Sequence, residues 1–400
     1  MRQILEGSQA IAQTIKNINP AVISAYPITP QTHIVEDLAK FKADDKAKYT
    51  YVRAESEFAA ASIVAGSSAT GVRVYTATSS QGILLMTEVL YNIAGMRLPV
   101  VLTCANRGVS APITIWNDHQ DAMSIRDAGW IILFAENHQE AVEQHLLAYK
   151  VAEQVGLPVM VNVDGFVLTH TYEGVSVPST NQVKNYLPDY KPAKGAFLDT
   201  DNPASFGAFA APAYYMEIRE ELHDALVDSQ KVLKREYENL KQAIPEVIKQ
   251  SEKKAQVNNA LIEYYGPKNP TTVLVAMGSL VGTVKDAVDE IENNAGLKAK
   301  LNINSVGVLK IKTFRPFPEK EVLKIIQKAK FVAVLEKAVS LGATDGPLAL
   351  DMKATAKNET LAKVQSFIVG LGGKDITKKM IDKILVEIKK PGDKMKFINK

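Results

Sequence analysis

The first 165 or so residues alternate short apolar runs with helical segments, and this alternation constrains the fold more than any other feature of the chain. Strands are predicted near residues 21–25, 49–53, 72–77, 99–104, 130–135 and 158–163. Parallel strands need a long crossover, usually a helix, and their helices cover both faces of the sheet. The sequence therefore predicts an α/β protein built on a parallel sheet.

The second half of the chain changes character twice. Residues 165–213 contain scattered Pro and Gly with little periodicity, which predicts an extended segment that wraps a neighbouring subunit. Mixed charges at helical spacing follow and predict an exposed helical linker over 214–258. Apolar runs near 271–277, 303–311, 330–336 and 364–369 then predict a second sheet. We expect two α/β domains, 1–213 and 259–400, joined by that linker.

Composition excludes several classes of partner. The 47 basic and 44 acidic residues leave a net charge of +3, too balanced for a nucleic-acid or membrane-surface protein. No apolar run approaches the roughly 18 residues that a membrane span needs. The amino-terminal residues 1–17 predict an amphipathic helix and lack a signal-peptide core. We therefore expect a cytoplasmic protein.

Cysteine and histidine usage argues against a metal centre. Cys104 is the only cysteine, which excludes an intrachain disulfide, a Cys₄ iron–sulfur cluster and a Cys-rich zinc site within the chain. The six histidines form no HExxH motif. His138 and His145 are seven residues apart on a predicted helix, on a face that we expect to meet solvent. We predict that this chain alone holds no metal.

Two acids follow the strand predicted near 49–53, at the start of a helix rich in small residues. Ligands of open α/β sheets bind at the carboxyl ends of the strands, but acids in a first helical turn are also favoured by the helix dipole. We assign the dipole role to Glu55, which is next to Arg53 and expected to be exposed. An apolar run follows Glu57, so there we expect a half-buried functional acid.

Three polar loops follow predicted strands of the first domain, over residues 26–32, 79–82 and 105–121. The first presents the Thr29 hydroxyl in a PxxP frame, although such a loop can simply cap the next helix. The third places Arg107 after a buried strand, where a guanidinium binds either a substrate carboxylate or an acid of another subunit. Asp118–Asp121 is more typical of a polar turn that opens a helix than of half a metal site. Together the loops predict a site for a small anionic substrate.

Nucleotide-binding fingerprints are absent. Gly370-Leu371-Gly372-Gly373 departs from GxGxxG because Asp375 occupies the last glycine position, and no GxxxxGK[ST] occurs. A turn with positive φ accounts for these glycines.

With these segments in view, the chain resembles the alpha subunits of multisubunit 2-oxoacid:ferredoxin oxidoreductases, and among them those that act on pyruvate. The resemblance covers nearly the whole chain and rests on YPITP, ESE with TATSSQGILLM, ANR with DHQD, VDGF and GLGGKD. It implies a pyrimidine-binding domain of the thiamine-diphosphate type followed by a transketolase C-terminal-like domain. The family's GDG thiamine-diphosphate motif does not occur here, which agrees with its location on a beta subunit.

The resemblance also implies roles for individual residues. The family's cofactor-activating glutamate falls on Glu57, and its substrate-binding threonine and arginine fall on Thr29 and Arg107. Further contacts to thiamine diphosphate are expected from the same loops. These contacts come from Pro27, Ile28, Ser80 and Gln81.

By the same resemblance, the enzyme oxidatively decarboxylates pyruvate with coenzyme A to acetyl-CoA, CO₂ and reduced ferredoxin, or runs in reverse. The implied partners are beta, gamma and delta subunits, together with ferredoxin. The [4Fe-4S] clusters are implied on the beta and delta subunits, and Mg²⁺ on a partner subunit. A branched-chain 2-oxoacid, 2-oxoglutarate or oxalate is the alternative substrate. A non-catalytic scaffold subunit is the alternative of another class.

Overall fold

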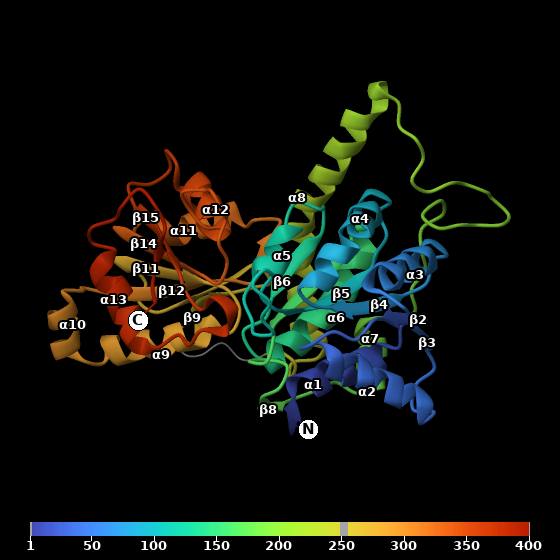
Figure 1. The fold of residues 1–400 in the computed structure, drawn as a ribbon, viewed down its shortest axis with the longest axis horizontal. Helices are drawn as coiled ribbons and strands as arrows, with labels where there is room; N and C mark the ends of the chain where they lie inside the picture. The colour runs from blue at the N-terminus through green and yellow to red at the C-terminus, as the bar shows by residue number, and fades with distance from the viewer. Residues whose placement is uncertain (1, 249–254, 400) are drawn as a thin grey trace.

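A computed structural model describes residues 2–248 and 255–399 and consists of two α/β lobes. Figure 1 shows the lobes next to each other, with the long helix α8 (Pro212–Ala243) between them and its amino-terminal end projecting away from the body. In the described residues, no helix combines the length and apolarity that a bilayer crossing requires.

The first lobe is built on a seven-stranded sheet with the order β13-β6-β7-β5-β4-β2-β3. Six of its strands come from the first half of the chain and are parallel to their neighbours, as predicted. They are β2 (Val22–Ala25), β3 (Thr50–Arg53), β4 (Val74–Thr78), β5 (Val101–Asn106), β6 (Ile131–Phe134) and β7 (Val159–Asp164). The seventh, β13 (Thr313–Arg315), comes from the second half and pairs antiparallel with β6.

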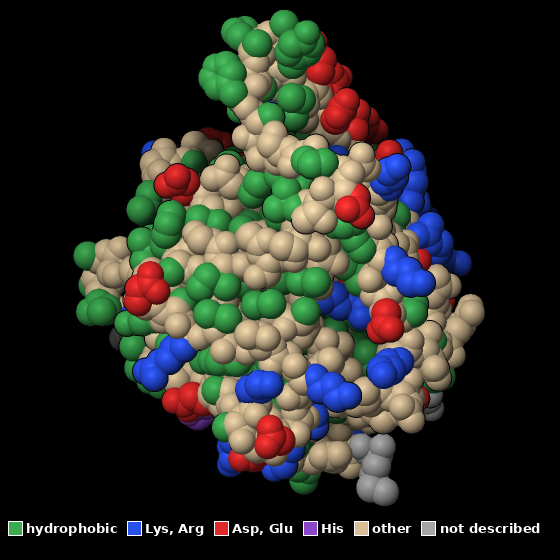
Figure 2. Space-filling view, turned by 90° about the vertical axis from the view of Figure 1, so that its right-hand side faces the viewer, with side chains coloured by type: hydrophobic (Ala, Val, Ile, Leu, Met, Phe, Trp, Pro, Cys, Tyr) green, Lys and Arg blue, Asp and Glu red, His purple; other side chains and the backbone are tan. Residues whose placement is uncertain are grey.

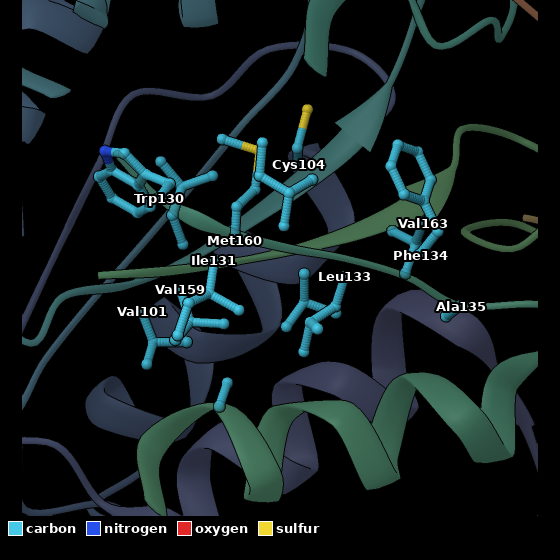
Figure 3. Close-up of a cluster of buried hydrophobic side chains, with 14 of the residues drawn as sticks. Val101, Cys104, Trp130, Ile131, Leu133, Phe134, Ala135, Val159, Met160 and Val163 are labelled. Carbon is cyan, nitrogen blue, oxygen red and sulfur yellow. The ribbon is translucent and has the colours of Figure 1, made fainter. Parts of the chain in front are cut away.

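Helices pack on this sheet and bury its apolar side chains. They are α1 (Gly7–Ile18), α2 (Thr32–Ala43), α3 (Glu57–Ala69), α4 (Gln81–Gly95), α5 (Gln120–Ser124) and α6 (His138–Val155). In Figure 3, Val101, Val159 and Leu133 lie on the side of the strands that faces a helix, and Trp130 and Cys104 lie on the other side. All five are buried, as expected for a parallel sheet covered on both faces.

The second lobe holds another seven-stranded sheet, with the order β16-β15-β14-β11-β12-β10-β9. The strands are β9 (Ala255–Asn258), β10 (Ile262–Tyr265), β11 (Thr272–Ala276), β12 (Val306–Ile311), β14 (Phe331–Glu336), β15 (Lys363–Ile368) and β16 (Lys396–Phe397). The helical segments are α9 (Leu280–Glu292), α10 (Ala295–Leu301), α11 (Glu319–Ile326), α12 (Pro347–Ala356), η1 (Leu371–Gly373) and α13 (Lys378–Glu387). Strands β9 and β10 run antiparallel and the others parallel.

Two predicted segments differ in the structure. The amino terminus begins with strand β1 (Gln3–Glu6), which pairs with β8 (Tyr172–Val175), and the helix starts only at Gly7. Residues 165–213 are not wholly extended, because the helix α7 (Thr180–Tyr186) lies within them. The predicted domain limits remain a proposal. Strand β13 lies within the predicted second domain, 259–400, but pairs with β6 of the first sheet.

The histidine face of α6 was predicted wrongly. His138 and His145 are both buried, because α6 packs against the sheet, α1 and α8 instead of facing solvent. The Nε2 of His145 lies 2.6 Å from the Thr103 hydroxyl. Burial lowers the pKa of His145 to about 4.

A buried cluster of charges joins the two lobes. Lys310 of β12 places its Nζ 2.7 Å from a Glu136 carboxylate oxygen and 2.9 Å from one of Glu140, both in the first lobe. Lys312 continues the cluster, with its Nζ 3.0 Å from Glu143. The charges offset one another at a position that water does not reach.

Candidate active site

Four neighbouring parallel strands of the first sheet, in the order β5-β4-β2-β3, bring the predicted site residues to one edge. The loop with Thr29 follows β2, and Glu57 follows β3. Ser80 follows β4, and Arg107 follows β5. Carboxyl ends of parallel strands meet at the same edge of a sheet, which is where such proteins bind ligands.

Glu57 is the first residue of α3, and local contacts fix its position. The Ser56 side chain caps the helix by accepting a hydrogen bond from the Ala59 N–H at 3.1 Å. Glu57 is buried and Glu55 is exposed, which confirms the predicted contrast between the two acids. A side chain on Gly82 would collide with the Thr78 hydroxyl and come within 3.0 Å of Glu57 Oε1. Glycine at the start of α4 therefore lets the two helices approach closely.

The Glu57 carboxylate has no hydrogen bond or ion pair to any residue in 2–248 or 255–399, although only 8% of the residue is exposed. In the same region, Thr78 Oγ1 and Ser79 Oγ are inaccessible to solvent and have no partner among the described residues. Buried polar groups are nearly always paired, so each such exception calls for an explanation. Unused hydrogen-bonding capacity is thus concentrated at the carboxyl end of β4.

Arg107 and Thr29 are in direct contact. The Arg107 guanidinium donates from Nη1 to the Thr29 carbonyl at 3.0 Å and from Nε to the Thr114 carbonyl at 2.7 Å. Its Nη2 has no partner in the described part of the chain. Burial lowers the pKa of Arg107, and the Asp121 carboxylate opposes that shift. Thr29 itself is exposed, whereas Arg107 is buried, with 7% of the residue accessible.

The second loop is tied to the third. Ser80 has φ of 47°, a left-handed conformation that a non-glycine residue adopts only when its surroundings hold it. Its hydroxyl lies 2.6 Å from the Gly108 carbonyl, and Gln81 donates to the Ser110 hydroxyl at 2.5 Å.

Pro27 and Ile28 belong to the first loop, with Pro27 exposed and Ile28 half-buried. Buried Gln31 anchors this loop by accepting from the Ile28 N–H at 3.3 Å and donating to the Ala77 carbonyl at 2.6 Å.

Sequence reasoning missed Asp121, which holds these loops together. Its carboxylate accepts from the backbone N–H of Ser80 at 3.0 Å, of Arg107 at 2.9 Å and of Ala122 at 2.8 Å, and from Asn106 Nδ2 at 2.9 Å. Burial raises the pKa of Asp121, while the four donors act in the opposite direction. In the sequence, Asp121 is one member of a polar turn, and nothing local marks it as buried.

Residues of the second lobe contact the loop 105–121. Gly372 of the GLGG turn donates to Asp118 at 3.1 Å, and burial raises the pKa of Asp118 to about 6. His119 Nε2 lies 2.6 Å from Asp164, which Lys337 Nζ also contacts at 2.9 Å. The His119 N–H also donates to the Lys337 carbonyl at 2.7 Å, so Asp118 and His119 both make contacts between the lobes. The GLGG turn has positive φ at three glycines, as predicted.

Comparison with protein families assigns both lobes. The family described as pyruvate flavodoxin/ferredoxin oxidoreductase, thiamine diphosphate-binding, matches residues 13–239. The core domain II of pyruvate:ferredoxin oxidoreductase matches residues 271–381. The chain belongs to the pyruvate:ferredoxin oxidoreductase family.

Curated relatives agree with this family. Pyruvate synthase subunit PorA of Methanocaldococcus jannaschii is 42% identical over 98% of this chain and 96% of its own length. That of Methanosarcina barkeri is 42% identical over 97% of this chain and 92% of its own. Ketoisovalerate oxidoreductase subunit VorA of Pyrococcus horikoshii is 38% identical over 98% of this chain and 94% of its own.

A solved structure shares the fold. The 2-oxoglutarate:ferredoxin oxidoreductase from Magnetococcus marinus, with 2-oxoglutarate, coenzyme A and succinyl-CoA bound, superposes with a TM-score of 0.72 at 19% identity. The match covers 96% of this chain and 65% of that chain, so this chain spans about two thirds of it. The predicted α/β architecture is thereby confirmed as that of a 2-oxoacid:ferredoxin oxidoreductase.

Proposed function

We propose that this chain is the alpha-type subunit of a thiamine-diphosphate-dependent 2-oxoacid:ferredoxin oxidoreductase that acts on pyruvate. The reaction joins pyruvate and coenzyme A to give acetyl-CoA, CO₂ and reduced ferredoxin, or runs in reverse. The observation that carries this proposal is the buried Glu57 carboxylate without a partner in the described residues, at the ligand-binding edge of the sheet. The PorA relatives favour pyruvate.

The residues around Glu57 fit an aminopyrimidine ring. Thiamine diphosphate, when bound, supplies a carbon nucleophile at C2 of its thiazolium and then takes up the electron pair that decarboxylation releases. The Glu57 carboxyl group would hold the pyrimidine ring by a hydrogen bond to a ring nitrogen and would keep a proton at that position. Ser80 and Gln81 line this position from the start of α4, and Pro27 and Ile28 line it from the loop after β2.

Arg107 and Thr29 bind the substrate carboxylate. A guanidinium with a free Nη2 offers a charge-assisted hydrogen bond, and the exposed Thr29 hydroxyl offers a second donor. Because the Thr29 carbonyl accepts from Arg107, the two donors are held together before the substrate arrives. Binding by two short groups suits a small 2-oxoacid.

The partners follow from what this chain lacks. Its lone cysteine provides no ligand set for an iron–sulfur cluster, so we assign the [4Fe-4S] clusters to the beta and delta subunits. Mg²⁺ is likewise assigned to a partner subunit, and the complex, with a gamma subunit, passes electrons to ferredoxin in the cytoplasm. Figure 2 shows much apolar surface on the face turned to the viewer. Large exposed apolar residues of α3 and α4, next to Glu57, suit such a partner. They are Phe58, Leu84, Leu85 and Tyr91.

A branched-chain 2-oxoacid is the second candidate substrate, because the VorA relatives match this chain almost as well as the PorA relatives do. Ferredoxin reduction by the complex, compared between pyruvate and 2-oxoisovalerate, separates the two.

Replacement of Glu57 by Gln tests the proposal. This variant keeps the size and a hydrogen bond but cannot supply the carboxyl proton, so we expect turnover to fall by about 10²–10⁴-fold for every 2-oxoacid. The exchange of the C2 proton, followed by NMR on the assembled complex, should slow to a similar extent. The matched control is Glu55→Gln, for which the rate of C2-proton exchange and the turnover should equal those of the wild type. Wild-type exchange in Glu57→Gln would remove this residue from the mechanism.

A further inference from the structure

Three distant segments of the first lobe bring Glu6, His33 and His170 together. Glu6 ends β1, His33 lies in the first turn of α2, and His170 lies between β7 and β8. One ligand atom from each residue lies within 4.8 Å of the others. The Nδ1 of His33 is 2.7 Å from Glu6 Oε1, and the two imidazole rings are tilted by 38° with centroids 4.5 Å apart.

A second acid, Asp37, lies near this cluster. Asp37 follows His33 by one helical turn, so the two side chains lie on the same face of α2. Asp37 is half-buried and has no hydrogen bond or ion pair within residues 2–248 and 255–399. The Glu6 and Asp37 carboxylates interact electrostatically. A bound divalent cation would relieve the repulsion between these two negative charges.

The surroundings of His170 prepare it as a ligand. Its Nδ1 lies 2.7 Å from the Thr169 hydroxyl, which leaves Nε2 as the nitrogen available to an ion. Phe166 packs on the His170 ring at 4.7 Å and holds its orientation.

We propose that Glu6, His33 and His170 bind a divalent transition metal of the Zn²⁺ type, with Asp37 completing or neutralising the site. Two imidazoles with carboxylates are a donor set that suits Zn²⁺ and its first-row neighbours, whereas Mg²⁺ and Ca²⁺ prefer all-oxygen sites. The His33 side chain is 47% exposed, so an ion can enter from solvent. A metal here would fasten the amino-terminal strand to α2 and to the connection after β7.

This inference does not depend on the proposed function, and it changes the expectation from the sequence that the chain alone holds no metal. The ligands lie at positions 6, 33 and 170, a spacing that no metal-binding motif has. Only the pairing of β1 with β8 and the packing of α2 bring them together.

Calorimetry on the full chain, free of any affinity tag and stripped of metal with EDTA, tests the site. We expect Zn²⁺ to bind with one-to-one stoichiometry and to raise the unfolding temperature, while Mg²⁺ neither binds nor competes. The single variants His33→Gln and His170→Gln should bind at least about 10- to 100-fold more weakly, since loss of even outer contacts to a metal has effects of that size. The matched control is His223→Gln, which replaces an exposed histidine of α8 and should bind like the wild type.

Circular dichroism in EDTA establishes that each variant is folded before its affinity is read. X-ray absorption at the zinc edge of the wild type then provides a measurement that needs no variant, because scattering from two imidazoles identifies the ligands. Equal zinc binding by the wild type and the His33→Gln/His170→Gln double variant would overturn the proposal. A bound zinc without imidazole scattering would do so as well.

Discussion

Replacement of Asp121 by Asn should loosen two loops of the candidate site at once. The carboxylate accepts four hydrogen bonds from buried N–H donors, two of them on Oδ2 from the N–H groups of Ser80 and Arg107. The other two reach Oδ1 from Asn106 and Ala122. An amide has one acceptor oxygen, so at most two of the four bonds survive, and its NH₂ group then faces two donors.

The size of the effect follows from this count. A hydrogen bond to a charged acceptor contributes about 1.5–3 kcal/mol, so losing two should lower the free energy of unfolding by roughly 3–6 kcal/mol. Urea unfolding of the full chain, followed by tryptophan fluorescence, measures this loss. The control Asp127→Asn changes a side chain that is 71% exposed and should stay within about 0.5 kcal/mol of the wild type. A loss below about 1 kcal/mol for Asp121→Asn would refute the hydrogen-bond account, because it would mean that the four donors find other partners.

Two further predictions concern single cations. Arg107→Ala removes a charged hydrogen bond of about 1.5–3 kcal/mol, so kcat/KM for pyruvate in the assembled complex should fall roughly 10- to 150-fold. The control Arg53→Ala, at the exposed end of β3, should leave kcat/KM unchanged. If Arg107→Ala instead keeps its activity but the complex dissociates, Arg107 forms an ion pair between subunits. Lys310→Met leaves buried carboxylates without their cation and should destabilise the chain by about 3–5 kcal/mol in urea unfolding. The control Lys378→Met removes an exposed ion pair, with Glu290 3.2 Å away, and should lower the free energy of unfolding by less than about 1 kcal/mol. Equal losses for Lys310→Met and Lys378→Met would contradict the argument that burial makes the first pair costly to break.

The sequence predicted the central sheet and the edge where the site lies, because both depend on local patterns. Buried parallel strands are continuous apolar runs, and their order along the chain places the following loops at one edge. The contrast between Glu55 and Glu57 was equally local, since an apolar run follows the second acid. The direct contact between Thr29 and Arg107 lies within this edge.

Features made by distant segments escaped prediction. Strand β1 forms only because β8 pairs with it, and residues 1–17 read alone as one amphipathic helix. His138 and His145 are buried by α1 and α8, which periodicity along α6 does not reveal. Asp121 gains its role from Ser80, which lies 41 residues away. In each case the partner of the residue, and not its own neighbourhood in sequence, determines what it does.

Strand β13 makes the two lobes a single piece of architecture. It leaves the second lobe, completes the free edge of β6 in the first, and returns to α11. A fragment that ends before β13 would present the β6 edge unpaired, and an open edge invites association with other strands. Neither half is therefore an interchangeable module. Chimeras between relatives should exchange residues 131–134 and 313–315 together, as one inherited pair.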